Sequence, residues 1–118
     1  MTISDSLAVV LVRFPFTDLT SAKKRPAVIV SPWQYSERYG DVVIIPLTSV
    51  NQNDDSLRLA QWKDAGLLKE TWVKPLLATV SKSLITRQLG RLHERDMRCV
   101  RSSLKQMLSI APESRASG

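Results

Sequence analysis

Short runs of β-branched and aliphatic residues, separated by proline, glycine or polar loops, dominate this 118-residue chain. Such runs are typical of β-strands, and the interruptions keep each strand short. A turn or short helical piece is expected at Trp33–Gly40. We predict strands at LAVVLVRFPF (Leu7–Phe16), RPAVIVS (Arg25–Ser31), DVVIIPLT (Asp41–Thr48), LRLAQ (Leu57–Gln61), TWVKPLLATV (Thr71–Val80) and ITRQL (Ile85–Leu89).

One segment, Glu94–Leu108, has the periodicity of a helix. Its apolar residues recur at steps of three and four, which predicts one buried face: Met97, Val100, Leu104 and Met107 or Leu108. The whole pattern predicts a mainly β fold, a compact and strongly curved β-barrel with a C-terminal helix. We expect one domain over residues 1–110 and a frayed tail at residues 111–118.

The composition and charge indicate which kinds of partner and stabilising bond the chain could have. A formal net charge of +6 favours a polyanion such as nucleic acid, although many basic domains bind none. One cysteine, Cys99, and one histidine, His93, exclude an internal disulfide and a structural zinc site. No apolar run is long enough to cross a bilayer, and Met1–Ser6 lacks the features of a signal peptide. These features predict a cytoplasmic protein without membrane contact.

The sequence lacks several familiar catalytic motifs. There is no glycine-rich phosphate loop, no GxSxG and no HExxH. A single histidine cannot supply a two-histidine acid–base pair, and the carboxylates form no recognisable metal-binding pattern. Any catalysis is therefore expected to use Arg, Lys, Ser and Thr, without a metal or another cofactor.

Three segments resemble the MazF/PemK toxin family when taken in order. LVRFPFTDLTSAKKRPAVIVS (Leu11–Ser31) is similar to the family's opening strand–loop–strand, and VVIIPLTS (Val42–Ser49) to its third strand. AGLLKETWVKPLLATVSKSLITRQLGRL (Ala65–Leu92) is similar to the second half of PemK-like members. The family pattern is not matched at Leu7-Ala8, where relatives commonly have Gly-Asp, or at Pro75-Leu76, where several carry an acidic residue.

The resemblance implies the SH3-like barrel of CcdB/Kid-like toxins and a homodimer that forms the RNA-binding surface. It implies a growth-inhibiting toxin of a type II toxin–antitoxin system that cleaves single-stranded RNA, mRNA included, at selected sequences. The family uses the 2′-hydroxyl and leaves 2′,3′-cyclic phosphate and 5′-hydroxyl ends. A cognate antitoxin with a flexible acidic segment would block the surface, and the complex would bind DNA.

The same resemblance assigns site residues. Arg25, in the RP motif, and Thr48 match the family's catalytic residues. A guanidinium offers forked donors to the charge that builds up on phosphorus, and a threonine hydroxyl can bond the scissile phosphate. We expect an RNA-binding role for five further residues: Lys23, Lys24, Ser49, Lys74 and Trp33.

Two other functions stay open on sequence grounds, because a fold does not fix a function. One is a non-catalytic barrel that binds a protein target such as gyrase. The other is a basic module that binds RNA without cutting it. The sequence also leaves the general base unassigned, since arginine is a poor base near neutral pH.

Overall fold

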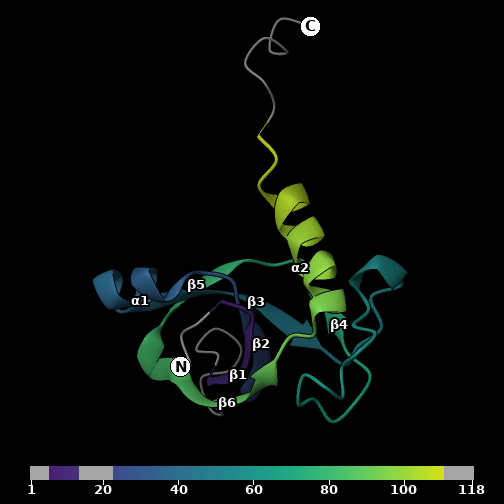
Figure 1. The fold of residues 1–118 in the computed structure, drawn as a ribbon, viewed down its shortest axis with the longest axis horizontal. Coiled ribbons are helices and arrows are strands. Elements are labelled where there is room, and N and C mark those ends of the chain that lie inside the picture. The colour runs from purple at the N-terminus through teal and green to yellow at the C-terminus, as the bar shows by residue number, and fades with distance from the viewer. Residues whose placement is uncertain (1–5, 14–22, 111–118) are drawn as a thin grey trace, which may run out of the picture.

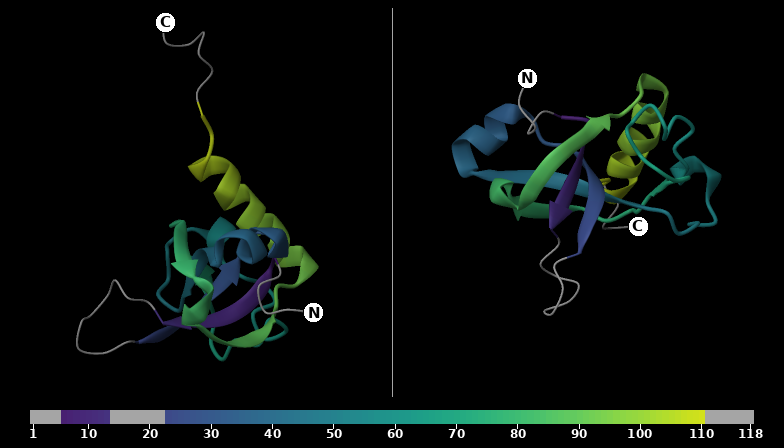
Figure 2. Two further views of the ribbon diagram at one scale, coloured as in Figure 1. Left: turned by 90° about the vertical axis from the view of Figure 1, so that its left-hand side faces the viewer. Right: turned by 90° about the horizontal axis from the view of Figure 1, so that it is seen from below.

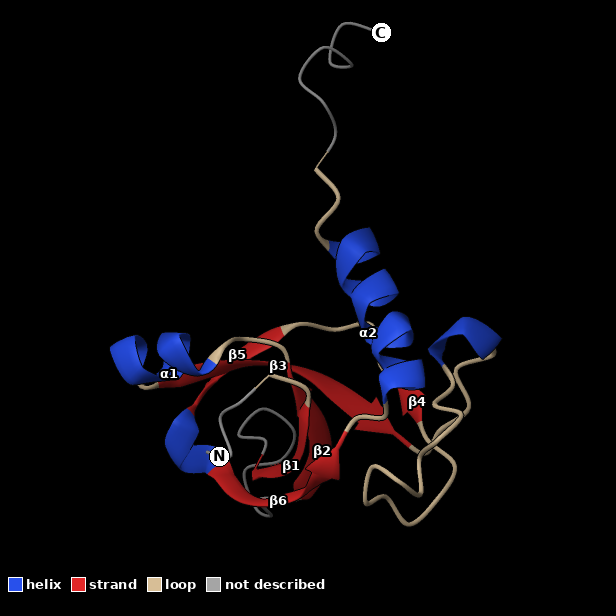
Figure 3. Ribbon diagram, in the orientation of Figure 1, coloured by secondary structure: helices blue, strands red, loops and turns tan. Residues whose placement is uncertain are grey.

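The computed structural model describes residues 6–13 and 23–110, and Figures 1 and 3 show their arrangement. Most elements are strands, and two α-helices lie outside the curved sheet. The strands are β1 (Ala8–Arg13), β2 (Lys24–Ile29), β3 (Asp41–Thr48), β4 (Trp72–Val73), β5 (Ala78–Ser81) and β6 (Ile85–Arg91). The helices are α1 (Trp33–Tyr39) and α2 (Glu94–Met107), with two single 3₁₀ turns, η1 (Asp55–Leu57) and η2 (Lys82–Leu84).

The strands form one antiparallel sheet in the order β4-β3-β2-β1-β6, and β5 pairs with Asp41–Ile44 of β3, before the residues of β3 that pair with β4. The sheet curls into an incomplete ring (Figures 1 and 2). β5 and β6 are joined through η2 but do not pair, so hydrogen bonds do not close the sheet. The predicted fold class, a mainly β barrel-like fold with a C-terminal helix, is confirmed, with an open rather than closed sheet.

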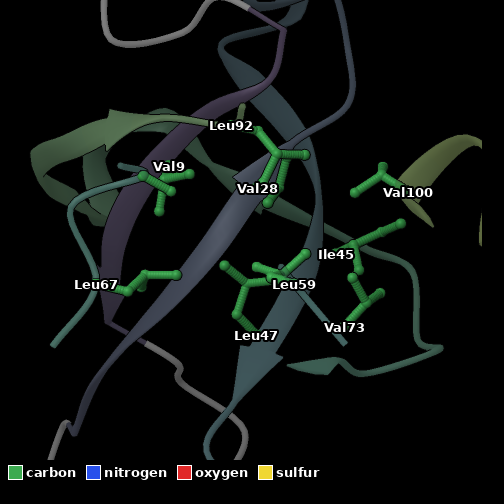
Figure 4. Close-up of a cluster of buried hydrophobic side chains, with 10 residues drawn as sticks. Val9, Val28, Ile45, Leu47, Leu59, Leu67, Val73, Leu92 and Val100 are labelled. Atoms are coloured by element: carbon green, nitrogen blue, oxygen red, sulfur yellow. The ribbon is translucent and has the colours of Figure 1, made fainter. Parts of the chain in front are cut away.

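Both faces of the central strands are buried. Alternate residues point into the curl, where Val10, Ala27, Ile29 and Ile44 belong to an inner core. The intervening residues form an outer core against α2 and the segment before β4 (Figure 4). This outer core contains Val9, Val28, Ile45, Leu47, Leu59, Ala65, Leu67, Val73, Leu92 and Val100. Two buried faces explain why these strands read as nearly continuous apolar runs.

The prolines mark places where strand pairing changes, as their missing N–H requires. Pro26 pairs with β1 but lies beyond the last β2–β3 pair, Ala27 with Pro46. Pro46 lies between the last residue of β3 that pairs with β5, Ile44, and the first that pairs with β4, Leu47. Pro26 therefore stands where the β2–β3 pairing ends, and Pro46 stands where β3 exchanges β5 for β4.

Gly66 closes a turn between η1 and β4, with a φ of 86°. A Cβ on Gly66 would lie 2.1 Å from the carbonyl oxygen of Leu89, and one on Gly90 would lie 2.5 Å from that of Ala65. The two glycines thus let the turn touch the backbone of β6. No other residue type fits this contact without a backbone shift.

Two strand predictions were wrong in detail. Leu57–Gln61 is not a strand: it begins in η1 and keeps a single bridge, Arg58 with Trp72. The Asp54 carboxylate accepts from the Ser56 N–H and caps η1, a local bond that competes with strand pairing. The predicted strand Thr71–Val80 is split into β4 and β5, because Pro75 interrupts it.

Helix α2 begins one residue after His93, whose Nδ1 accepts from the Arg95 N–H at 3.0 Å. A histidine cap explains why no Ser, Thr, Asp or Asn marks this helix start. On the predicted apolar face Val100 is buried and Leu104 is half-buried, whereas Leu108 is 58% exposed. The C-terminal half of the helix projects away from the barrel (Figure 1).

The predicted tail at residues 111–118 lies outside the described residues. Within residues 6–13 and 23–110, no helix is both long and apolar enough to cross a membrane.

Candidate nucleic-acid interface

Arg25 and Thr48 lie at corresponding positions of two neighbouring strands. The β2–β3 register pairs Ala27 with Pro46 and Val28 with Ile45. Continued for two residues beyond the last pair, it brings Arg25 level with Thr48. Because side chains alternate along a strand, both residues belong to the face opposite Val28 and Ile45. Residues that are 23 positions apart in the sequence thus share one face at one end of the sheet.

The side chains at this end of the sheet differ in exposure. Arg25 is exposed, and Thr48 is partly exposed. The Thr48 Oγ1 accepts from the Val50 N–H at 3.1 Å, so the hydroxyl still has its own hydrogen to donate. Ser49 follows as an exposed residue of the turn.

The loop after Thr48 is held by its own hydrogen bonds. The Gln52 side-chain amide donates to the Val50 carbonyl, and the Asn53 N–H donates to Asn51 Oδ1 at 2.8 Å. Asn53 has a φ of 57°, a left-handed conformation that asparagine tolerates. The loop between β1 and β2 is described only from Lys23 onward.

The predicted lysines are spread around the same end of the sheet. Lys23 and Lys24 are exposed at the start of β2, and Lys24 pairs with Arg13 of β1. Lys74 follows β4 and is exposed, and its N–H donates to the Pro46 carbonyl at 3.0 Å. By alternation, Lys24 belongs to the face opposite Arg25. The lysines therefore surround the Arg25–Thr48 end without sharing a single face.

Trp33 is the one predicted residue that the structure does not bring to this end. It opens α1, at the opposite end of β3 from β4 (Figure 1). Ser31, two residues before Trp33, bonds the Val43 N–H, and five residues of β3, roughly 16 Å, separate Val43 from Thr48. Trp33 is 51% exposed and lies on the same short helix as the ring pair Tyr35–Tyr39, whose centroids are 4.9 Å apart.

Sequence reasoning gave no role to Arg13, and missed the position of Arg58. Arg58 is bridged to Trp72, which in turn is paired with Thr48. Its Nε donates to Glu70 Oε1 at 3.0 Å in an exposed ion pair. The sequence signal was the LRL triplet, in which Leu57 and Leu59 flank one charged residue. That triplet gives no indication of the pairing between Arg58 and Trp72.

Two titratable groups of the described residues have shifted pKa values, and neither is one of the predicted site residues. Burial raises the pKa of the Cys99 thiol to about 11, and the thiol donates to the Ser56 carbonyl. The hydrogen bonds from Ser56 lower the pKa of the Asp54 carboxyl. In the described part of the chain, no three His, Cys, Asp or Glu side chains lie close enough to hold a metal ion.

This arrangement suits recognition of a phosphate. A permanently charged guanidinium and a hydroxyl donor, on neighbouring strands and one face, can together bond the oxygens of one phosphodiester. The surrounding lysines add positive charge that attracts the rest of a polyanion. The rigid sheet fixes the positions of both donors.

Comparison with known proteins identifies the family of the chain and solved structures that share its fold. Residues 6–108 match the family described as PemK-like, MazF-like toxin of type II toxin–antitoxin systems. No curated protein sequence gives a significant match.

Solved structures with the same fold include MazE–MazF from Deinococcus radiodurans, at 18% identity and a TM-score of 0.74, covering 93% of this chain and 100% of that one. An endoribonuclease with its cognate antitoxin from a mycobacterial species has 19% identity, a TM-score of 0.63 and coverage of 95% and 99%. The Mycobacterium tuberculosis toxin MazF-mt6 has 14% identity, a TM-score of 0.70 and coverage of 89% and 99%. At these identities the likeness establishes the fold.

Proposed function

Because the chain belongs to the PemK-like, MazF-like toxins of type II toxin–antitoxin systems, we propose that it is an endoribonuclease that cleaves single-stranded RNA and so inhibits growth. The observation that carries this proposal is the register that aligns Arg25 with Thr48 on one face. The substrate would be cytoplasmic mRNA. Cleavage would be selective for sequence and independent of metal ions.

The reaction follows from the groups available. The 2′-oxygen of the substrate attacks the adjacent phosphorus, and the bond from phosphorus to the 5′-oxygen of the next nucleotide breaks. The products are a 2′,3′-cyclic phosphate and a 5′-hydroxyl, so no water enters this step. The 2′-hydroxyl proton must be removed and the leaving 5′-oxygen must gain one.

Arg25 would act on the charge that this attack creates. Negative charge grows on the two non-bridging oxygens as phosphorus becomes five-coordinate, and the guanidinium can donate to both. Thr48 would donate its remaining hydrogen to one of these oxygens. Because a guanidinium stays protonated near neutral pH, Arg25 is assigned to charge stabilisation and not to proton removal.

Binding of the flanking RNA would use the surrounding residues. Lys23, Lys24 and Lys74 would contact phosphates, and Ser49 would donate a further hydrogen bond. Trp33 lies too far from Thr48 to join the same site within one protomer. An RNA-binding role for Trp33 therefore requires a longer RNA or the second protomer of a dimer.

The partners we propose are a second copy of the chain and an antitoxin. The Deinococcus structure is a MazE–MazF pair, and one mycobacterial structure contains an endoribonuclease with its cognate antitoxin. An acidic flexible segment would fold onto the basic end of the sheet and place carboxylates where RNA phosphates bind. Antitoxin and RNA would then compete, and both would bind more weakly as salt rises.

The test is incubation of the purified protein with a long single-stranded RNA in the presence of EDTA. Discrete fragments that persist in EDTA support the proposal. Binding without cutting would instead identify an RNA-binding module. Neither binding nor cutting would favour a barrel toxin that acts on a protein target such as gyrase.

A further inference from the structure

The described surface carries one arginine that is aligned with Thr48 and has no place in the reaction above. We propose that Arg58 is a second phosphate-binding residue, held in position by Glu70, which contacts the RNA backbone beyond the scissile phosphate. This inference rests on the proposed function, because it assumes that RNA occupies the Arg25–Thr48 end of the sheet.

The strand pairing places Arg58 in line with Thr48. Thr48 pairs with Trp72 across β3 and β4, and Trp72 is bridged on its other side to Arg58. Their neighbours Leu47, Val73 and Leu59 all belong to the outer core. Because side chains alternate, Thr48, Trp72 and Arg58 belong to the opposite face.

The distance between Thr48 and Arg58 determines which RNA phosphate Arg58 can contact. Two strand spacings lie between Thr48 and Arg58, about 10 Å across the sheet. Because its Nε bond keeps the guanidinium beside Glu70, Arg58 would meet a different phosphate from the one at Thr48. Trp72 lies between them in the strand pairing and is 7% exposed, so it leaves little surface for a ligand.

The ion pair with Glu70 fixes the arginine without using all of its donors. Nε donates to Glu70 Oε1 at 3.0 Å, and both side chains are about half exposed, at 47% and 48%. Among the described residues no other acceptor bonds this guanidinium, so its terminal N–H groups stay available to a ligand. An exposed ion pair of this kind adds little to stability, about 0–1 kcal/mol, so both partners can be exchanged without unfolding the protein.

Glu70 has a second effect on binding. Its negative charge lies beside the position where the phosphate would bind, and like charges repel. Removing that charge in Glu70→Gln should strengthen RNA binding severalfold, whereas removing the positive charge in Arg58→Gln should weaken it. Opposite effects from the two partners of one ion pair are not expected if the pair serves only the fold.

The experiment uses fluorescence anisotropy of a single-stranded RNA that carries a 2′-O-methyl group at the mapped cleavage site. Wild type, Arg58→Gln and Glu70→Gln are compared with Arg101→Gln, which removes one positive charge from an exposed position on α2. Arg58→Gln should bind about tenfold more weakly and lower the slope of log affinity against log salt by about 0.7. Arg101→Gln should match wild type, and single-turnover cleavage at saturating RNA should be unchanged in Arg58→Gln.

Shortened RNAs locate the contact. Two analogues, each ending at the nucleotide next to the scissile phosphate on one side, are titrated with wild type and Arg58→Gln. The two proteins should bind one of these analogues equally well, because it lacks the phosphate that Arg58 contacts. An unchanged affinity and salt slope in Arg58→Gln, with tight binding and cleavage by wild type, would overturn this inference alone. Absence of binding and cleavage in wild type would overturn the proposed function as well.

Discussion

At the scale of single residues, Arg25 makes the claim that is easiest to test. It is exposed at the start of β2, so its replacement should leave the fold intact. Arg25→Ala removes the donors assigned to the developing charge and should slow cleavage by roughly 10²-fold or more, as for lost oxyanion donors. Thr48→Ala should also slow cleavage and affect RNA binding less.

Single-turnover rates at saturating RNA measure this effect apart from binding. Lys105→Ala, an exposed position on α2, is the matched control and should cleave at the wild-type rate. A folded Arg25→Ala variant with a near-wild-type rate would remove Arg25 from the reaction.

Individual residues also show how much of the site could be predicted from the sequence. The RP motif and the Thr-Ser pair could be recognised in the sequence, and β2 and β3, which carry them, were predicted close to their observed bounds. The alignment of Thr48, Trp72 and Arg58 was not predictable, because it depends on a two-residue strand and on one isolated bridge. Both are too short to leave a periodic pattern.

At the scale of elements, α2 is fixed to the barrel by a buried carboxylate as well as by its apolar face. Asp96 is 3% exposed and accepts from the backbone N–H groups of Ala60 and Gln61 at 2.9 and 2.8 Å. The sequence gave no sign of this contact, since an aspartate in a first helical turn usually faces solvent. The carboxylate supplies acceptors to a segment that is not paired in the sheet.

Replacing Asp96 by Ala should therefore lower the free energy of unfolding by about 2 kcal/mol or more, because two charge-assisted hydrogen bonds are lost. Glu94→Ala, in the same turn but exposed, should cost under about 1 kcal/mol through the helix dipole. Urea unfolding followed by circular dichroism compares the two. Equal losses would mean that the Asp96 contacts do not secure the helix.

The contact between the 63–67 turn and β6 can be tested by a pair of glycines. Gly66→Ala must accommodate a Cβ at 2.1 Å from the Leu89 carbonyl and should prevent or severely weaken folding. Gly40→Ala has a similar positive φ, 72°, but nothing within 4 Å of the new Cβ. It should cost only about 1 kcal/mol. Thermal unfolding of both variants distinguishes the cost of a positive φ from the cost of the close contact. Similar melting temperatures would mean that the contact with Leu89 adds no cost.

At the scale of the whole molecule, the proposed assembly is a two-fold dimer. A chain of this size still exposes large apolar side chains, among them Leu68 at 93% and Ile110 at 91%. Small domains often cover such surface in symmetric dimers. Sedimentation equilibrium at micromolar concentration should give twice 13.3 kDa. A monomer well above that concentration would exclude an RNA-binding surface shared between protomers.

The overall architecture was the most predictable level. Burial on both faces gives the central strands nearly continuous apolar runs in the sequence, and an apolar stripe at helical spacing predicts α2. The open side between β5 and β6 could not be foreseen, because closure depends on pairing between strands that are adjacent in the chain yet turned apart by η2. The predicted strand at Leu57–Gln61 failed because η1 covers its first residue and because Ala60 and Gln61 donate their N–H groups to Asp96.

The most direct test of the central claim is the chemistry of the cleaved ends. A short RNA containing one cleavage site is digested in EDTA, and the fragments are analysed by mass spectrometry. We predict a 2′,3′-cyclic phosphate on the upstream fragment and a 5′-hydroxyl on the downstream one, with no cleavage when that nucleotide is 2′-deoxy. A 3′-hydroxyl product, or equal cleavage of the 2′-deoxy substrate, would contradict attack by the 2′-oxygen and the roles given to Arg25 and Thr48.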